Sequence, residues 1–330
     1  MTHDAHDHAY HPDRRQVLRT WLPPLAASGL LAAAGVALGG REGRHRPQDA
    51  PTTPPARPRD WRVEGAKPLL AAASGEGPEV NLRRALAAVG GIGAFVRRGE
   101  KVAVKPNCAW DRTPEQAANT NPELVAELVR QCLEAGAAQV TVLDNTCHDP
   151  DRSFARSGIG PAAAAAGARV LHQGNAGTVL LDLGGTVLGH WEVLTPLVEA
   201  DRVINVPIVK HHSLGILTLG MKNWFGAIVG RRGNLHQQLP RVCAELGAAL
   251  RPTLTVVDAT RVMISGGPTG GSLELVRTLD RIAVATDPVA ADAWAAEQMD
   301  VAADRLSYLA LAEGMGLGAS DWRSLEVAPA

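Results

Sequence analysis

The sequence predicts an α/β fold: a mostly parallel sheet with helices on both faces, built from βαβ units. From about Pro68 onward, short β-branched runs alternate with helical stretches, which is the rhythm of crossover units. Hydrophobic residues make up 45% of the 330 residues and charged residues 20%, so the chain can bury a core. We expect residues 67–330 to form a single domain.

The first crossover unit carries the clearest local signals. Residues 101–105 form a predicted strand that Pro106 stops. Asn121 is the expected N-cap of the following helix, with Pro122 at its first position, and Gly136 ends it. Residues 140–143 form the next strand. A strand, a helix and a second strand within about 40 residues predict two neighbouring parallel strands.

The same alternation continues toward the C-terminus. It predicts a helix at 161–166, strands at 169–172 and 202–206, a helix at 235–250, strands at 254–257 and 281–285, and a helix from 288 to 299 capped by Asp287.

Composition argues against two classes of protein. The formal net charge is −1 and aromatic residues are 4%, whereas nucleic-acid binders usually show a basic excess or aromatic stacking platforms. We therefore expect no nucleic acid as partner. Four cysteines are too few for a disulfide scaffold.

Residues 1–40 resemble a twin-arginine signal peptide. Arg14 and Arg15 precede a weakly apolar run at 21–39, although Val17 and Arg19 stand where Phe and Lys are common. The alternative is a single membrane anchor, which two prolines in the run weaken. We expect export by the twin-arginine machinery to the periplasm or cell surface, with membrane contact only through an uncleaved signal. Residues 41–66, rich in Arg and Pro, are the expected linker.

Polar residues follow the predicted strands. Open parallel sheets bind ligands beyond the carboxyl ends of their strands, so we expect an anion pocket for a small ligand there. The alternative is that Lys105, Lys210 and Lys222 are ordinary surface lysines that form no pocket. Neither G-x-G-x-x-G nor a P-loop occurs in the sequence. The predicted substrate-binding residues are Lys105, Asn107, Lys210, Lys222, Asn223, Gly267 and Gly270.

Histidines and carboxylates in the same region could perform acid–base chemistry. We expect His212 or His236 to move a proton, with Asp144 and Asp258 orienting a histidine or holding a metal. Adjacent side chains on a strand diverge, so only one of His211 and His212 is expected to point inward.

Two cysteines, Cys108 and Cys147, follow the two strands of the first crossover unit. They could form a disulfide, ligate a metal ion or an iron–sulfur centre together with His211, or be unrelated loop thiols. The sequence leaves these alternatives open, and with them the cofactor.

The ordered motifs resemble the family called domain of unknown function 362, in its exported branch. They are Lys105-Pro106-Asn107, Thr120-Asn121-Pro122, Asn205-Val206-Pro207, Met221-Lys222-Asn223-Trp224-Phe225-Gly226, Leu235-His236, Val257-Asp258 and Asp287-Pro288. The resemblance covers about residues 101–318. It implies little about activity, because members are mostly uncharacterised. Some carry a ferredoxin-like module, whose clustered cysteines this chain lacks. The stretch from Lys210 to Gly226 is also similar to a His and Gly-Gly-x-Lys segment of lactate racemases, as an analogy only.

These observations favour an exported enzyme that acts on a small anionic substrate, with a metal or redox cofactor as an option. A non-catalytic periplasmic or cell-surface binding protein for an anion or a metal would use the same pocket. The sequence leaves open whether the chain is an enzyme.

Overall fold

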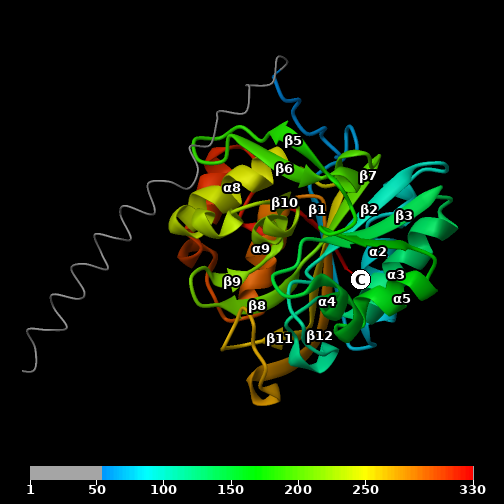
Figure 1. Cartoon of the computed structure of the whole chain (residues 1–330). Helices are drawn as coiled ribbons and strands as arrows, with labels where there is room; N and C mark the ends of the chain where they lie inside the picture. Colours follow the sequence, from blue (N-terminus) through cyan, green and yellow to red (C-terminus); the bar gives the residue numbers. More distant parts are fainter. Residues whose placement is uncertain (1–53, 330) are drawn as a thin grey trace, which may run out of the picture. The chain divides into compact units, whose positions relative to one another are not determined.

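A large mixed β-sheet runs through the centre of the molecule (Figure 1). The computed structural model describes residues 54–329. The predicted signal peptide and the start of the predicted linker lie outside the described residues. In the described part the strands are β1 (Leu69–Ser74), β2 (Lys101–Pro106), β3 (Gln139–Asp144), β4 (Arg169–His172), β5 (Thr178–Asp182), β6 (His190–Leu194), β7 (Arg202–Val206), β8 (Ile208–His212), β9 (Ile216–Thr218), β10 (Ile228–Val229), β11 (Leu254–Met263), β12 (Val276–Ala285) and β13 (Glu326–Pro329).

Ten of the strands described in residues 54–329 form the central sheet. Its order is β13-β1-β12-β11-β7-β2-β3-β4, with β8 beside β11 and β9 beside β8, while β10, β6 and β5 form a separate small sheet. The neighbours β7, β2, β3 and β4 are parallel, as predicted. β12 runs antiparallel between β1 and β11, because the chain returns from β11 through a loop instead of a crossover helix. The predicted mostly parallel sheet is confirmed, with this antiparallel insertion.

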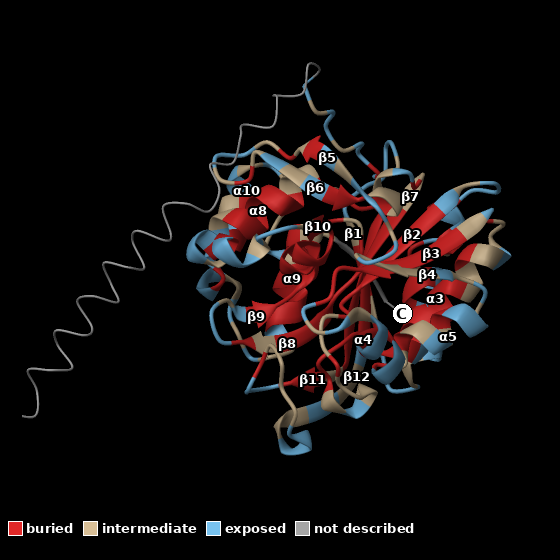
Figure 2. Cartoon of the chain, in the orientation of Figure 1, coloured by how far each residue is buried: buried red, intermediate tan, exposed pale blue. Residues whose placement is uncertain are grey.

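Helices cover both faces of the sheet. They are α2 (Pro78–Ala88), α3 (Pro122–Glu134), α4 (Pro150–Arg156), α5 (Ile159–Ala165), α6 (Thr195–Val198), α7 (Gly220–Asn223), α8 (Leu239–Ala249), α9 (Pro288–Glu297) and α10 (Ser307–Gly314). Figure 1 shows α2, α3 and α5 on one side and α8 and α9 on the other. Side chains alternate accordingly: Val102 and Val104 of β2 join the core under α2 and α3, and Ala103 joins the core under α8 and α9. The central strands are therefore buried on both faces, as Figure 2 shows.

The helix boundaries follow the local signals. Asn121 caps α3 by accepting a hydrogen bond from the Glu123 N–H at 3.0 Å, and Asp287 caps α9 in the same way. Both predicted caps are confirmed. The helix predicted at 235–250 begins later, at Leu239, because a 3₁₀ helix, η4 (Arg232–Gln238), precedes it.

The C-terminal end of the predicted linker is part of the fold. Trp61 is fully buried and its indole Nε1 donates a hydrogen bond to the carbonyl of Ala200 at 3.1 Å. The backbone of Trp61 also bonds Arg251 and Thr253. The solvated linker expected through residue 66 is therefore corrected at this end, because one large aromatic side chain fills a gap in the core.

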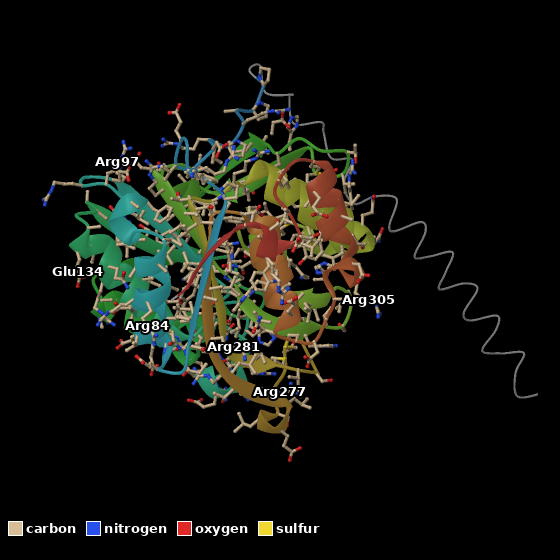
Figure 3. The ribbon with its side chains drawn as sticks, turned by 180° about the vertical axis from the view of Figure 1, so that it is seen from behind. Arg84, Arg97, Glu134, Arg277, Arg281 and Arg305 are labelled. Carbon is tan, nitrogen blue, oxygen red and sulfur yellow. The ribbon has the colours of Figure 1, made fainter. Side chains whose placement is uncertain are left out.

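Charged side chains lie mostly on the outer surface. Figure 3 labels six that are exposed: Arg84, Arg97, Glu134, Arg277, Arg281 and Arg305. Within residues 54–329, no helix is both long and apolar enough to cross a membrane.

A buried carboxylate positions the short helix α7. Asp292 on α9 accepts hydrogen bonds from the N–H groups of Gly220 and Met221, at 2.6 and 3.0 Å, and from the Tyr308 hydroxyl at 3.0 Å. Burial raises the pKa of Asp292 to about 6, so the carboxylate is mostly ionised at neutral pH and above. This contact ties α7 to the helical layer formed by α9 and α10.

We expect Asp292→Ala to lower the free energy of unfolding by roughly 3 to 5 kcal/mol, because it leaves three buried donors without an acceptor. Tyr308→Phe removes one of these hydrogen bonds and should cost only about 1 kcal/mol. Urea denaturation at pH 8 measures both. Equal costs for the two variants would contradict the anchoring role of the carboxylate.

Candidate functional site

A cavity of about 180 Å³ lies beyond the carboxyl ends of β2 and β3, close to β8 and α7. This is the place where the sequence predicted a ligand site. Nine of the predicted site residues line it: Lys105, Asn107, Asp144, Cys147, Lys210, His212, Lys222, Asn223 and His236. Residues that the sequence analysis did not select also line it, among them Trp110, Thr218, Phe225 and Arg232.

The innermost contact is a buried ion pair. Lys105 Nζ donates to Asp144 Oδ1 at 2.8 Å, and the two side chains are 1% and 2% exposed. The same ammonium donates to the Pro106 carbonyl and to Asn223 Oδ1. An ammonium has three N–H groups, so every donor of Lys105 is used within the protein. Lys105 therefore organises the site, and it has no free donor for the ligand we predicted it to bind.

Asn107 and Asn223 join the ion pair to a second lysine. Asn107 Nδ2 donates to Asn223 Oδ1 at 3.0 Å, and Asn107 Oδ1 accepts from Lys210 Nζ at 3.1 Å. Asn223 Nδ2 in turn donates to the side chain of Asn205 on β7. Both asparagines thus act through the lysines that they hold in position.

Lys210 has a different environment from Lys105. It is 1% exposed, and its Nζ contacts two neutral acceptors, Asn107 Oδ1 and the carbonyl of Ala118. No carboxylate of the described residues bonds it. Burial, together with the positive charge of Lys222, lowers the pKa of Lys210 to about 7.

Lys222 and Arg232 also line the cavity, and their contacts differ. Lys222 Nζ lies 4.9 Å from the centre of the Phe225 ring, and none of the described side chains or carbonyls accepts a hydrogen bond from it. Arg232 donates to the carbonyls of Phe225 and Thr146, at 2.6 and 2.8 Å. Arg232 is the first residue of η4, where the sequence offers no motif to mark it.

One hydroxyl of the cavity wall has no partner. Thr218 is 4% exposed, and its Oγ1 is buried without a hydrogen bond in the described structure. Thr218 on β9 lies directly opposite Lys210 in the antiparallel pair of β8 and β9. A buried hydroxyl without a partner is costly, so its place is one that a ligand would complete. Thr218 lies in an apolar segment two residues before α7, and no sequence motif marks it.

His212 has a defined proton arrangement. Its Nδ1 accepts hydrogen bonds from the N–H groups of Leu214 and Gly215, at 3.1 and 3.2 Å. Burial and the neighbouring Lys222 lower the pKa of His212 to about 3, so the ring is neutral and its proton is on Nε2. His212 therefore suits hydrogen-bond donation better than the proton acceptance we considered for it.

His236 has the opposite arrangement. Its Nδ1 lies 3.1 Å from the carbonyl of Gly233, which requires Nδ1 to carry the proton and leaves a lone pair on Nε2. Burial and Lys222 lower the pKa of His236, so this lone pair is free at neutral pH. The two imidazoles are stacked with centroids 6.1 Å apart. Of the two histidines, His236 is the one suited to accept a proton.

Three of the predicted catalytic and substrate-binding residues lie outside the cavity. Asp258 is in the interior of β11, which continues to Met263, and it accepts from the Asn121 N–H and from Thr260. The predicted catalytic position of Asp258 is corrected because its strand does not end there. Gly267 and Gly270 belong to the loop between β11 and β12, where their backbones pack closely against His211 and Met263. Only the neighbouring Pro268 lines the cavity.

The predicted metal ligands do not come together. Cys108 is buried with its Sγ 3.5 Å from Ser157 Oγ, whereas Cys147 is exposed with its Sγ near Arg232. His211 points away from His212, and its Nδ1 accepts from the Gly267 N–H. Both cysteines are free thiols, although their loops are adjacent. In the described part of the chain, no three His, Cys, Asp or Glu side chains form a metal-binding group. The predicted ligand set for a metal or iron–sulfur centre therefore does not fit.

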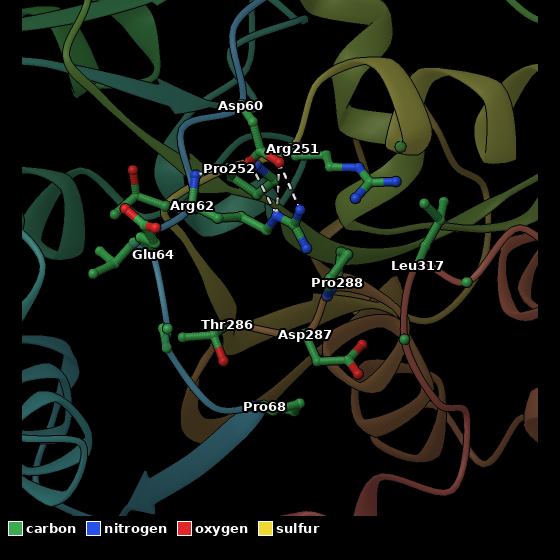
Figure 4. A pocket seen from close by; sticks show the side chains of 17 residues that line it. Asp60, Arg62, Glu64, Pro68, Arg251, Pro252, Thr286, Asp287, Pro288 and Leu317 are labelled. Atoms are coloured by element: carbon green, nitrogen blue, oxygen red, sulfur yellow. Dashed lines mark hydrogen bonds and ion pairs between the residues drawn. The ribbon is translucent and has the colours of Figure 1, made fainter.

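A larger groove of about 650 Å³ lies elsewhere, between residues 60–68 and the loops at 286–288 and 316–318. Figure 4 shows that Asp60 and Arg62 pair with each other at its wall. Asp287, also in this groove, uses its carboxylate to bond the N–H groups of Val289, Ala290 and Ala319. The side chains of Asp60, Arg62 and Asp287 are thus bonded within the protein, and none of the predicted site residues lines this groove.

Lys210 should impose a pH dependence on stability. The pKa of Lys210 is about 7 in the folded protein, whereas its ordinary value, which applies to the unfolded chain, is 10.5. Between pH 7 and 10.5 the unfolded chain therefore holds a proton that the folded chain has released. The free energy of unfolding of the wild type should therefore rise relative to Lys210→Met, by about 2 kcal/mol between pH 7.5 and 9.5. Urea denaturation of both proteins at the two pH values measures this. A difference that stays constant with pH would show that Lys210 keeps its ordinary pKa.

Comparison with known proteins identifies relatives of the chain. The family model named domain of unknown function (DUF362) matches residues 102–297. The chain is 26% identical over 246 residues to the thylakoid-associated protein sll1697 of Synechocystis, covering 72% of this chain and 74% of the relative.

A solved structure is also similar. The lactate racemase apoprotein from Thermoanaerobacterium thermosaccharolyticum is 14% identical, with a TM-score of 0.39. The match covers 72% of this chain and 58% of the racemase, so the chain spans less than two thirds of that protein. The family model, by contrast, covers more than half of the chain and includes the strands and loops that form the cavity, and the chain therefore belongs to the DUF362 family.

Proposed function

We propose that the chain is an enzyme that binds a small anion in the cavity and moves a proton on it. One observation carries the proposal. Four cationic side chains line the cavity, Lys105, Lys210, Lys222 and Arg232, against a single carboxylate, Asp144. Because Asp144 is already paired with Lys105, the remaining cations have no anionic partner in the cavity wall. Buried cations without counter-charges favour an anionic ligand.

The size of the cavity limits the ligand. At about 180 Å³ it is smaller than the cavities of 300 Å³ and more that hold drug-sized molecules. A carboxylate or phosphate with a few further heavy atoms suits it. In the proposed complex, Lys222 donates to the anionic group and Arg232 adds its positive field, while the Thr218 hydroxyl bonds a further oxygen of the ligand.

The histidines supply the proposed chemistry. His236 Nε2, with its lone pair free, would take a proton from the bound ligand. His212 Nε2–H would donate a hydrogen bond to an oxygen on which negative charge develops. Lys222 supports both roles, because its charge disfavours protonation of either ring before the ligand binds.

A non-catalytic binding protein for an anion would use the same cations. The free Nε2 of His236 is the feature that favours an enzyme, since capture alone needs no proton acceptor. The two functions can be separated with His236→Gln. An enzyme would lose turnover in this variant while its ligand binding stayed unchanged.

We also propose, from the leader sequence, export through the twin-arginine route to the periplasm or cell surface, with a cofactor loaded beforehand. Metal analysis of protein from its own host tests the cofactor.

Anion binding should depend on Lys222. We expect Lys222→Met to weaken the binding of inorganic phosphate, acetate or pyruvate by about 10- to 100-fold, as expected for loss of a charge-assisted hydrogen bond. The exposed Lys101 provides the matched control, and Lys101→Met should bind like the wild type. Isothermal titration calorimetry measures all three proteins. If none of the three anions binds the wild type, or if both variants behave alike, the proposed anion site is wrong.

A further inference from the structure

The three lysines of the cavity have three different hydrogen-bond environments. Lys105 has a carboxylate partner and uses all three N–H groups on fixed acceptors. Lys222 lies over the face of an aromatic ring, which favours an ammonium cation. Lys210 alone is bonded only by two neutral oxygen acceptors. This difference suggests that Lys210 has a different chemical role.

The contacts of Lys210 match those of a neutral amine. A neutral amine has two N–H groups and one lone pair, whereas an ammonium has three N–H groups. Asn107 Oδ1 and the Ala118 carbonyl accept two hydrogen bonds from Nζ, which leaves one position for the lone pair. Lys210 lines the cavity, so this position is available to a ligand there. Burial beside the charge of Lys222 lowers the pKa of Lys210 to about 7, in agreement with the geometry.

Groups that would assist a nucleophilic amine line the same cavity. The partnerless hydroxyl of Thr218 lies opposite Lys210 in the strand pair. His236 offers a lone pair for the proton that the amine must lose, and Lys222 offers a cation for a carboxylate. A ligand that bears both a carbonyl and a carboxylate would use all of these groups.

We propose that Lys210 is a nucleophile that forms an imine with a small 2-oxo acid bound in the cavity. This inference rests on the proposed anion site and names its substrate class. It makes Lys210 a catalytic residue and leaves the binding of the carboxylate to Lys222.

The reaction balances without an oxidant or a reductant. The Nζ lone pair attacks the carbonyl carbon, a C–N bond forms, and the electron pair of the C=O π bond moves to oxygen. His236 Nε2 takes one proton from nitrogen and delivers it to that oxygen, which gives a carbinolamine. The nitrogen lone pair then forms the C=N bond as the C–O bond breaks, and His236 transfers the remaining N–H proton to the departing hydroxyl, which leaves as water. Amine and ketone thus become imine and water.

Reductive trapping with pyruvate tests the proposal on the purified full-length chain. Pyruvate and cyanoborohydride should add one pyruvic acid plus two hydrogens minus one water to the wild type, and peptide mapping should locate the addition at Lys210. Lys210→Arg keeps a long side chain with N–H donors at this position but has no amine that can form an imine, so it should not be labelled. Lys101→Met should be labelled like the wild type, and Lys222→Met about 10- to 100-fold less at low pyruvate concentration. Mapping in the wild type decides the site even if Lys210→Arg does not fold.

The outcomes separate this inference from the anion site. Pyruvate that binds in calorimetry but does not label Lys210 would overturn the imine and leave the anion site intact. Labelling of the exposed Lys67 and Lys101 to the same extent as Lys210 would also overturn it. Failure of pyruvate, acetate and phosphate to bind at all would overturn both.

Discussion

The buried ion pair of Lys105 and Asp144 is the contact on which the cavity depends. Asp144 ends β3 and accepts, besides the lysine, hydrogen bonds from the N–H groups of Cys108 and Asn145. Lys105 near the end of β2 bonds Asn223 at the end of α7. Gly226 passes so close to the pair that a Cβ there would overlap the carboxylate. One contact thus joins two parallel strands, a helix and a loop. Loss of either partner would leave a buried charge uncompensated, at a cost of about 3 to 5 kcal/mol.

The remaining cations make the site electrostatically unbalanced. Burial disfavours the charged form of Lys210 and Lys222, and Lys222 in turn lowers the pKa of Lys210, His212 and His236. Burying these positive charges is unfavourable in the free protein. The Lys105–Asp144 ion pair and the Asp292 carboxylate nevertheless hold the elements that bear them in place. An anion would relieve this unfavourable burial, so affinity for an anion and reduced stability without one have the same cause. In the proposed function each lysine has its own role: Lys105 holds the structure of the site, Lys222 supplies positive charge and Lys210 is the reactive amine.

Local patterns predicted most of the fold. The caps at Asn121 and Asp287 and the parallel pairing of β2 with β3 are confirmed, because capping depends on neighbouring residues and a single short crossover joins the two strands. The direction of β12 and the length of β11 could not be predicted, since they depend on pairing with strands distant in the sequence. The error at Asp258 follows from this. We predicted that its strand ends at this polar residue. The pairing of β11 with β12 continues past Asp258 and keeps its carboxylate inside the sheet, where it accepts a hydrogen bond from the Asn121 N–H.

The sequence alone was enough to indicate the fold class, the family resemblance and the lysines, asparagines and histidines that meet beyond the strand ends. These depend on periodicity and on the rule that parallel strands end at one edge. Which of these groups is free to act was decided by tertiary contacts. Lys210 bonds a carbonyl 92 residues away in the chain, Lys105 bonds a carboxylate 39 residues away, and Arg232 joins the site from the start of η4, where no motif marks it. Hydrogen-bond saturation and burial are properties of the assembled neighbours, and no local pattern of residues encodes them.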